Sequence, residues 1–518
     1  MKLMRFILLC IASLMVTACQ NQTDDTLPSP SPQEDAPPES PPLAGISLDP
    51  FSIDWDDRKI FESGLIQEAR PILEKLTDNT IYHMDWTISP NLDSLNGDMI
   101  MRYTNREHAA LDALYLRLFP NILGGEMVVT GLSIDGDPVE GTLEKADSVL
   151  RIELPQALAP DAQVEVAGTF SIELPREISE ESGHYGLFGS FDNLLALEES
   201  YPILAAYDED GWDFDLPAPH GDLTHLDASY YIVRVRLPAH LQVVASGVTL
   251  DHRIQDEWQT LTFAAGPARD FYLAAGEFHL ASENFGETTI NSYILPGAES
   301  SNDEALLFSK AAMAVLNQRL GKYPYTEFDM ISSPMLALGM EYPGVVALNM
   351  KMYDPEAEIS GLPGTYFLEG VIAHEVAHQW YYNLVGNDQL EEPWLDEAIA
   401  QYLTGIYFFD FHGEEHFQGY RQSWLDRWEL VEQQPIPISL PAADYESPAY
   451  GAIVYGRGPL FVEALAEEMG DELFWEFLRA FTEQHTWEIS QPETFITMAE
   501  DACACDLTNL WETWGVHP

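Results

Sequence analysis

Basic residues are scarce in this sequence. Its 518 residues include 24 lysines and arginines against 85 aspartates and glutamates, which gives a formal net charge of −61 at pH 7. A surface with this charge repels phosphate backbones, so we expect no nucleic acid partner. The acidic excess is typical of a solvated surface, and attraction of cationic substrates is the alternative interpretation.

Cysteine is also scarce, with four residues in the chain. Cys10 and Cys19 lie in the first twenty residues, which leaves Cys503 and Cys505 in the segment DACACDL. This C-x-C pair either forms a local disulfide or remains as two small apolar residues, and its spacing does not fit a structural zinc site. The low number excludes a fold held together by a framework of disulfides.

Long apolar runs are missing, and the longest stretch, about a dozen residues ending at Val16, is too short to span a bilayer. Lys2 and Arg5 precede it, as in a signal peptide. The sequence V-T-A-C that follows resembles a bacterial lipobox. This implies a signal peptide at residues 1–18, lipidation of Cys19, and export to the periplasmic or extracellular face of a bacterial membrane. A plain secretory signal is the alternative, and which membrane would carry the anchor stays open.

Residues 19–44 are rich in proline, serine and acidic residues and contain almost nothing to bury, as in QTDDTLPSPSPQEDAPPESPPLA. Such a composition cannot offset the entropy that ordering would cost. We therefore expect a disordered tether between the lipid anchor and the first folded domain.

Residues 45–296 predict an all-β domain. Short segments alternate apolar and polar residues and are separated by turn-forming residues, as in IYHMDWTI, YYIVRVRLP and TTINSYILP. Residues 297–518 instead combine a helical segment, SNDEALLFSKAAMAVLNQRL, with the strand-like FDMISSP and VVALNMKMY. Helical stretches then follow around residues 365 to 385, 394 to 410, 414 to 432, 455 to 484 and 490 to 515. Helices after a small mixed sheet indicate an α+β domain, so we expect a multidomain α+β fold.

The segment VIAHEVAHQW contains an H-E-x-x-H motif. In a helix, His374 and His378 lie one turn apart on one face, so both imidazoles can bind one metal ion, with Glu375 beside it. A catalytic zinc takes a third protein ligand and keeps one position for water. Glu397, separated from His378 by eighteen residues, supplies this ligand if the chain reverses between two helices. The alternative is two core or surface histidines and a solvated glutamate.

These motifs resemble those of the M1 family of zinc aminopeptidases, the gluzincin group that includes aminopeptidase N and leukotriene A4 hydrolase. In that family, H-E-x-x-H is followed after eighteen residues by a glutamate within W-L-N-E-G-F-A. This chain has Asp396 where asparagine is usual and Ala398 in place of glycine, and neither is a ligand position. The resemblance implies one Zn²⁺ per chain on His374, His378 and Glu397. It also implies a thermolysin-like α+β domain at residues 297–518, after a saddle- or sandwich-like all-β domain.

Many members of this family carry a further helical domain that covers the cleft. This chain reaches Pro518 soon after the segment DLTNLWETW. We therefore expect a form without the C-terminal helical domain and with a more open cleft.

The stretch LGMEYPG resembles the family's G-x-M-E-N segment, which lies along the substrate. Gly339, Met340 and Glu341 match its core, whereas Leu338 and Tyr342 replace the usual first glycine and the asparagine. The resemblance implies that the main chain here pairs with the peptide and that Glu341 binds the free α-amine. A carboxylate that faces an ammonium in a partly desolvated cleft discriminates strongly against blocked amines. The alternative is an exposed glutamate in a turn.

Three further segments have weaker signals. VYGRGPLF resembles the family's Y-x-K-G segment, which implies that Tyr455 stabilises the transition state, with Tyr445 and Tyr450 as neighbouring alternatives. A second acid from the β domain often helps to bind the amine in this family, and Glu198 is the candidate. The segment YDEDGWDFD lacks the spacing of an EF-hand calcium loop and is interpreted as an acidic surface turn.

The predicted function is that of a zinc-dependent aminopeptidase that releases N-terminal amino acids from peptides at the cell envelope. Zinc would lower the pKa of a bound water towards about 7, and Glu375 would take its proton as the water attacks the first carbonyl. A thermolysin-like metalloendopeptidase and a lipid-anchored binding protein without catalytic activity are the alternatives. The preferred N-terminal residue and the oligomeric state stay open.

Overall fold

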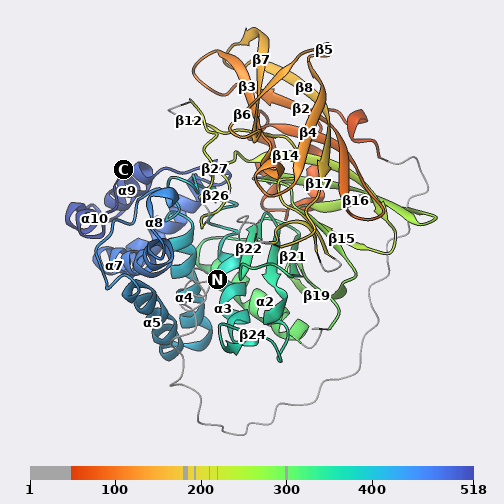
Figure 1. Ribbon diagram of the computed structural model, residues 1–518. Helices are drawn as coiled ribbons and strands as arrows, with labels where there is room; N and C mark the ends of the chain where they lie inside the picture. Colours follow the sequence, from red (N-terminus) through yellow and green to blue (C-terminus); the bar gives the residue numbers. More distant parts are fainter. Residues whose placement is uncertain are drawn as a thin grey trace.

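The computed structural model describes residues 48–178, 185–191, 194–208, 211–218, 220–297 and 301–517. The expected signal peptide, the lipidation site at Cys19 and the tether lie outside these residues. Figure 1 shows a strand-rich half, coloured red to yellow-green, and a second half in which the blue helices gather. The predicted fold class, a β domain followed by an α+β domain, is confirmed.

An eight-stranded sheet forms the centre of the strand-rich half. Its neighbouring strands are antiparallel except for β1 and β14, which are parallel. In sheet order the strands are β16 (Val248–Gln255), β17 (Trp258–Ala268), β14 (Ser229–Pro238), β1 (Ile81–Ile88), β2 (Ser94–Thr104), β8 (Gln163–Glu173), β4 (Glu126–Ile134) and β5 (Asp137–Pro138).

Two four-stranded sheets pack with it. The first contains β15 (Gln242–Ala245), β18 (Leu273–Gly276), β10 (Leu194–Leu197) and β9 (Phe188–Phe191). The second contains β11 (Ile203–Leu204), β3 (Leu111–Arg117), β7 (Val149–Leu158) and β6 (Gly141–Glu144). Apolar residues of the three sheets share one buried cluster in which aromatic rings pack together, with the ring of Trp86 edge-on to that of Phe271 and their centroids 5.6 Å apart. Strands β9, β10 and β18 are buried at every residue.

A five-stranded sheet carries one wall of the second half. Its order is β19 (His279–Phe285), β20 (Thr288–Ile294), β21 (Glu327–Ser333), β23 (Val345–Asn349) and β22 (Gly339–Tyr342). β20 pairs in parallel with β21, although the expected domain boundary at residue 296 separates the two strands. That boundary therefore does not coincide with a break between sheets.

The helices follow the sheet along the chain. They are α2 (Asn302–Arg319), α3 (Thr365–Ala377), α4 (Glu397–His412), α5 (Glu414–Glu429), α6 (Ala449–Ala452), α7 (Gly458–Met469), α8 (Asp471–Gln484), α9 (Pro492–Cys503) and α10 (Thr508–Trp514). The predicted stretch from 455 to 484 is divided at Gly470, whose φ of 81° ends α7. Among the described residues, none of the helices combines the length and the apolar character needed to cross a bilayer.

Short two-stranded ladders and 3₁₀ turns complete the chain. The ladders are β12 (Tyr207–Asp208) with β13 (Gly211–Trp212), β24 (Glu358–Ile359) with β25 (Leu362–Pro363), and β26 (Val385–Gly386) with β27 (Glu488–Ile489). The 3₁₀ turns are η1 (Pro50–Ser52), η2 (Arg58–Gly64), η3 (Arg70–Glu74), η4 (Phe119–Asn121), η6 (Met350–Met352) and η7 (Ala442–Asp444).

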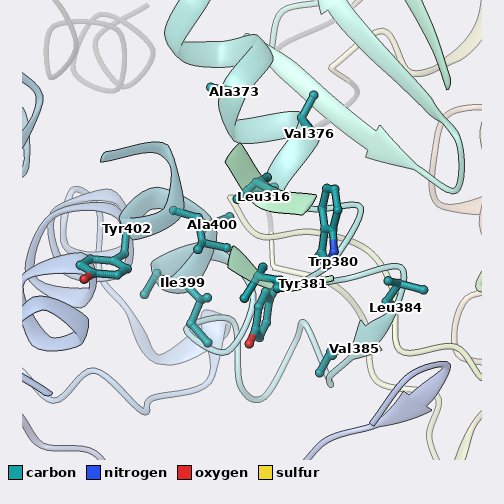
Figure 2. Packing of buried hydrophobic residues seen from close by; sticks show 14 of the residues in the cluster. Leu316, Ala373, Val376, Trp380, Tyr381, Leu384, Val385, Ile399, Ala400 and Tyr402 are labelled. Atoms are coloured by element: carbon teal, nitrogen blue, oxygen red, sulfur yellow. The ribbon is translucent and has the colours of Figure 1, made fainter. Parts of the chain in front are cut away.

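The helices α2, α3 and α4 share one apolar core. Figure 2 shows Leu316 of α2, Ala373 and Val376 of α3, and Ile399 and Ala400 of α4 within one cluster of buried side chains. The apolar residues of α3 and α4 therefore face each other, which fixes how the two helices lie relative to one another.

A buried arginine joins the two halves of the molecule. Arg269 follows β17, and its guanidinium donates to the carbonyl oxygens of Tyr382 at 3.0 Å, Leu384 at 3.1 Å and Glu488 at 2.6 Å. These carbonyls belong to the chain after α3 and to β27. The β domain therefore supports the segment that links α3 to α4.

The C-x-C pair is oxidised. Cys503, the last residue of α9, and Cys505 form a disulfide across Ala504, which has a φ of 50°. The open choice between a local disulfide and two free thiols is thereby decided in favour of the disulfide.

Candidate active site

Three potential metal ligands meet between α3 and α4. His374 lies in the last turn of α3, His378 directly follows this helix, and Glu397 is the first residue of α4. The Nε2 atoms of the two histidines are 3.2 Å apart, and Glu397 Oε2 lies 3.1 Å from that of His374 and 3.4 Å from that of His378. All three residues are buried. The chain reversal expected from the sequence thus brings the three side chains together.

Hydrogen bonds leave these atoms available to a cation. His378 Nδ1 lies 3.0 Å from the carbonyl oxygen of Tyr381, which assigns the proton to Nδ1 and a lone pair to Nε2. Glu397 Oε2 is buried and has no hydrogen-bond partner among the described residues, which is costly for a carboxylate oxygen unless a cation binds it. Two imidazole nitrogens and one carboxylate oxygen are a catalytic zinc donor set, so the group fits Zn²⁺.

The two glutamates of the site differ in proton affinity. Burial by itself raises the pKa of Glu397, but the imidazoles of His378 and His374 outweigh burial and hold this pKa well below its usual range. Burial and the charge of Glu341 instead raise the pKa of Glu375 well above its ordinary value. Glu397 is therefore suited to bind a cation as a carboxylate, whereas Glu375 is suited to hold a proton.

Glu375 is enclosed between α3 and β22. It is 4 % exposed, and its Oε2 has no hydrogen-bond partner in the part of the chain that the structure describes. A Cβ built on Gly339 would lie 2.7 Å from Glu375 Cγ and nearer still to the carboxylate. Only glycine at position 339 therefore allows the glutamate its present orientation.

β22 carries three of the four residues that were predicted to bind substrate. Gly339 and Met340 are half-buried, and Glu341 is buried with its Oε1 3.9 Å from His378 Nδ1. β22 lies at an edge of its sheet and pairs with β23 alone among the described strands. A free strand edge can bind an extended peptide through main-chain hydrogen bonds.

Tyr455 contacts the ligand group directly. It lies in a π-helical turn, Ile453–Arg457, between α6 and α7, a local widening that occurs often at functional sites. Its hydroxyl donates to Glu397 Oε1, and its ring centroid is 6.1 Å from that of His374. The phenol therefore lies within reach of a molecule bound beside the three ligands.

The two alternative tyrosines differ from Tyr455 in their contacts. Tyr445 donates to the carbonyl oxygen of Ile438 at 2.6 Å and so holds its own loop. Tyr450 packs edge-on to Tyr455 at 5.9 Å, and no described residue accepts from its hydroxyl. Arg457, at the family's lysine position, donates to main-chain carbonyls of Ile436, Thr513 and Trp514. Of the three tyrosines, Tyr455 is the one whose hydroxyl contacts a metal-ligand candidate.

Glu198 contacts Tyr342, the residue that follows the predicted amine anchor Glu341. Its Oε1 accepts from the hydroxyl of Tyr342 at 3.1 Å, and burial raises its pKa to about 8. Tyr342 also stacks on Tyr272 with ring centroids 3.8 Å apart. The tyrosine that replaces the family's asparagine therefore connects Glu198 to the strand that carries Glu341.

Three residues beside the site were missed by the sequence analysis. Gln389, in the loop between α3 and α4, lies within hydrogen-bond distance of Glu341, and Thr224 of the β domain donates to it. Asp222, two residues before Thr224, is half-buried, and burial together with the charge of Glu341 raises its pKa well above the ordinary value. One feature of the sequence indicated a residue like Gln389. Asp396 replaces an asparagine, and an aspartate has no amide hydrogens, so a neighbouring side chain has to supply a hydrogen-bond donor.

The interpretation of YDEDGWDFD as a surface turn is wrong for Asp213. Its side chain is 9 % exposed, and its Oδ2 lies 3.0 Å from Nδ1 of His225. The same nitrogen is 3.2 Å from Oδ2 of Asp388, in the loop before Gln389. The acidic segment thus contacts the catalytic half through a shared histidine, because burying these carboxylates requires a cationic partner.

Comparison with known proteins relates the second half to a peptidase family. The model of the peptidase family M1 domain matches residues 305–514. The chain is 24 % identical over 307 residues to mitochondrial aminopeptidase 2 of Saccharomyces cerevisiae, covering 57 % of this chain and 32 % of that protein. It is 22 % identical over 330 residues to glutamyl aminopeptidase of Bos taurus, covering 60 % of this chain and 34 % of that protein. The aligned part spans about a third of these relatives.

A solved structure extends the likeness to both halves of the molecule. The M1 zinc metallopeptidase from Deinococcus radiodurans superposes with a TM-score of 0.65 and 21 % identity, and the match covers 85 % of this chain and 93 % of that chain. At this identity the likeness supports the fold, while the family model and the motifs support the family. The domain formed by residues 305–514 therefore matches the peptidase family M1 domain.

Proposed function

We propose that this protein is a zinc-dependent aminopeptidase that releases the N-terminal residue of peptides. The observation that carries the proposal is the position of Glu341, whose carboxylate lies 3.9 Å from a nitrogen of the metal-ligand candidate His378. Within one residue, the amine nitrogen and the carbonyl carbon are about 2.5 Å apart. An ammonium bound by Glu341 therefore brings the first carbonyl, rather than a later one, to the ligand group.

Solved structures with a similar fold support action at chain ends. They are described as holding L-tryptophan, L-arginine or a Tyr-Ser-Ala substrate. Single amino acids and a tripeptide are the molecules that a site for N-terminal residues would accept. We extend this substrate class, peptides with a free N-terminus, to the present chain.

The residues of the site divide the reaction between them. His374, His378 and Glu397 would hold Zn²⁺, which when bound supplies a Lewis acid and a water of lowered pKa. Glu375, with its raised pKa, accepts the proton of the attacking water and returns it to the leaving nitrogen. Tyr455 donates its phenolic hydrogen to the oxygen on which charge develops, in place of its present acceptor Glu397.

A substrate panel tests this proposal. Free and N-acetylated aminoacyl 4-nitroanilides and internally quenched acetylated peptides would be incubated with the protein before and after chelation of the metal. We expect cleavage of the free substrates alone, its loss on chelation, and its recovery with added Zn²⁺. Internal cleavage of acetylated peptides would instead identify an endopeptidase, and zinc binding without any cleavage would identify a binding protein.

A variant of the base separates metal binding from turnover. Glu375→Gln keeps the size of the side chain and removes its ability to accept the proton. We expect this variant to bind one zinc per chain and to lose most of the turnover. Turnover equal to that of the wild type would refute the role of Glu375.

We also propose that the protein is exported and anchored to a bacterial membrane through a lipid on Cys19. The support is in the sequence, where Lys2, Arg5 and an apolar stretch precede V-T-A-C. We expect the wild type to incorporate labelled palmitate and to sediment with membranes. Cys19→Ser should remain in the soluble fraction without label, and sedimentation of this variant with membranes would refute the anchor.

A further inference from the structure

The carboxamide of Gln389 connects two acids of the candidate active site. Its Nε2 lies 2.9 Å from Asp396 Oδ2 and 3.4 Å from Glu341 Oε1. Its Oε1 accepts from the hydroxyl of Thr224 at 2.9 Å. Gln389 is 2 % exposed, so water has little access to it. Both amide hydrogens and the amide oxygen are thus directed at side chains of this site.

These partners fix the orientation of the carboxamide. In their carboxylate form Asp396 and Glu341 only accept hydrogen bonds, so towards that form a reversed amide would direct its oxygen at two acceptors. Thr224 can donate and therefore fits the oxygen. A buried donor or acceptor without a partner is costly, which favours the observed orientation over the reversed one.

Asp396 explains why a donor is needed at this point. Its Oδ1 accepts from the main-chain nitrogen of Glu397 at 2.7 Å and so caps α4 at the residue that is a metal-ligand candidate. Its Oδ2 requires a second donor, which the asparagine of related sequences would not require because it carries its own. Gln389 supplies this donor through its Nε2, and the same Nε2 also lies within hydrogen-bond distance of Glu341.

The β domain contacts this loop at two successive residues. Thr224 donates to Gln389, and His225, the next residue, lies 3.2 Å from Oδ2 of Asp388, the residue before Gln389. Asp388 Oδ1 in turn accepts from the main-chain nitrogen of Leu390 at 2.9 Å. Two adjacent residues of the β domain, Thr224 and His225, therefore hold two adjacent residues of the loop between α3 and α4, Gln389 and Asp388.

We propose that Gln389 is a positioning residue that holds Glu341 and Asp396 as a pair of carboxylates for the substrate ammonium, and that Thr224 of the β domain fixes its orientation. This inference rests on the proposed aminopeptidase function. It deepens that function because selection for a free N-terminus then depends on docking of the β domain. A cationic N-terminus would replace the electrostatic repulsion between the two acids with two charge-assisted hydrogen bonds.

The first test compares two substitutions at residue 224. Thr224→Ser keeps the hydroxyl and Thr224→Val removes it at nearly the same volume. With free aminoacyl 4-nitroanilides, we expect Thr224→Val to raise KM about three- to fivefold with kcat within about twofold, and Thr224→Ser to match the wild type. An equal rise of KM in both variants would show that packing, rather than the hydrogen bond, is responsible and would overturn the inference.

The second test removes the amide itself. Gln389→Met keeps the length of the side chain and removes both donors, so we expect KM for free substrates to rise about tenfold or more. Zinc content and thermal unfolding of the same samples report whether the ligand group and the fold are intact. An unchanged KM at one zinc per chain would refute the role of Gln389.

The wild type separates failure of this inference from failure of the proposed function. If the wild type does not cleave free aminoacyl substrates, or cleaves N-acetylated ones equally well, the aminopeptidase function and the inference both fail. If the wild type prefers free substrates but KM is the same in Thr224→Val and Gln389→Met, only the inference fails.

Discussion

Gly339 of β22 lies against the side chain of Glu375 in α3. A Cβ at residue 339 would approach Glu375 Cγ to 2.7 Å and its carboxylate more closely, a distance at which the side chain has to move. The strand that carries the predicted amine anchor thus also sets the position of the predicted base. The residue that is predicted to select the peptide bond, Glu341, and the residue that is predicted to transfer the proton, Glu375, are thus positioned by the same strand.

We expect Gly339→Ala to lower kcat while the fold persists. The added methyl meets the flexible end of Glu375 rather than main chain, so the carboxylate can rotate away at little cost in stability. A base displaced by about 1 Å loses on the order of a hundredfold in rate. Steady-state kinetics and zinc content of the variant check this expectation.

Gly370→Ala in α3 is the matched control. A Cβ there would lie 3.6 Å from Tyr420 Cε2, an ordinary contact distance. Alanine favours a helix over glycine by about 0.5 to 1 kcal/mol, so this variant should unfold at a slightly higher temperature with unchanged kinetics. Equal activity of Gly339→Ala and the control would contradict the steric argument.

Tyr455→Phe should reduce kcat without loss of zinc. The phenol is the donor closest to the ligand group, and removing one donor to a developing oxyanion lowers kcat by about a hundred- to a thousandfold. KM should change little because the donor acts mainly in the transition state. Tyr445→Phe loses hydrogen bonds to main-chain atoms of Pro437, Ile438 and Leu440 and none to the ligand group, so it should keep its kcat and lose about 1 kcal/mol of stability.

The metal-ligand group could be predicted because its spacing has a direct geometric meaning. His374 and His378 are one helical turn apart, and apolar residues around Glu397 predict a second helix that packs on the first. Both requirements are local in sequence. The structure brings these three residues together as the spacing indicates.

Gln389 and Thr224 could not be predicted in the same way. They are 165 residues apart, and neither lies in a periodic pattern or a motif. Their contact depends on how the β domain docks against the loop after α3, which side-chain packing between distant segments determines. The same reason applies to β20, whose alternating pattern predicts a strand but does not indicate which sheet it joins.

Arg269→Met should destabilise the contact between the two halves. Arg269 is 2 % exposed and donates to carbonyl oxygens of Tyr382, Leu384 and Glu488, which would all lose this donor. Hydrogen bonds from a charged group contribute about 1.5 to 3 kcal/mol each, so the free energy of unfolding should fall by about 3 kcal/mol or more. Urea unfolding measures this change.

Arg253→Met provides the comparison for Arg269→Met. Arg253 is one-third exposed and pairs with Asp251 two residues away, and pairs at the surface contribute at most about 1 kcal/mol. Similar losses of stability in the two variants would show that burial of the Arg269 guanidinium does not contribute as inferred.

The contact between His225 and its acids should make stability depend on pH in the alkaline range. Burial by itself lowers the pKa of His225, but hydrogen bonds and charges from Asp213 and Asp388 outweigh burial and raise this pKa to about 10. Asp208 also lies close to this imidazole, and the charge of His225 in turn lowers the pKa of Glu392, which burial raises. An unfolded histidine has a pKa of about 6.5.

These two pKa values determine how the contribution of His225 to the unfolding free energy changes with pH. Below pH 6.5 both states hold the proton, and the stabilisation by His225 is fully present. Between pH 6.5 and 10 the unfolded state releases the proton while the folded state keeps it, so the contribution falls by about 1.4 kcal/mol per pH unit. The difference in unfolding free energy between the wild type and His225→Gln should therefore be largest near pH 6 and shrink towards pH 10. Urea unfolding across this pH range measures the difference, and His240→Gln, at an exposed histidine, is the control. A difference that stays constant with pH would contradict a charged His225.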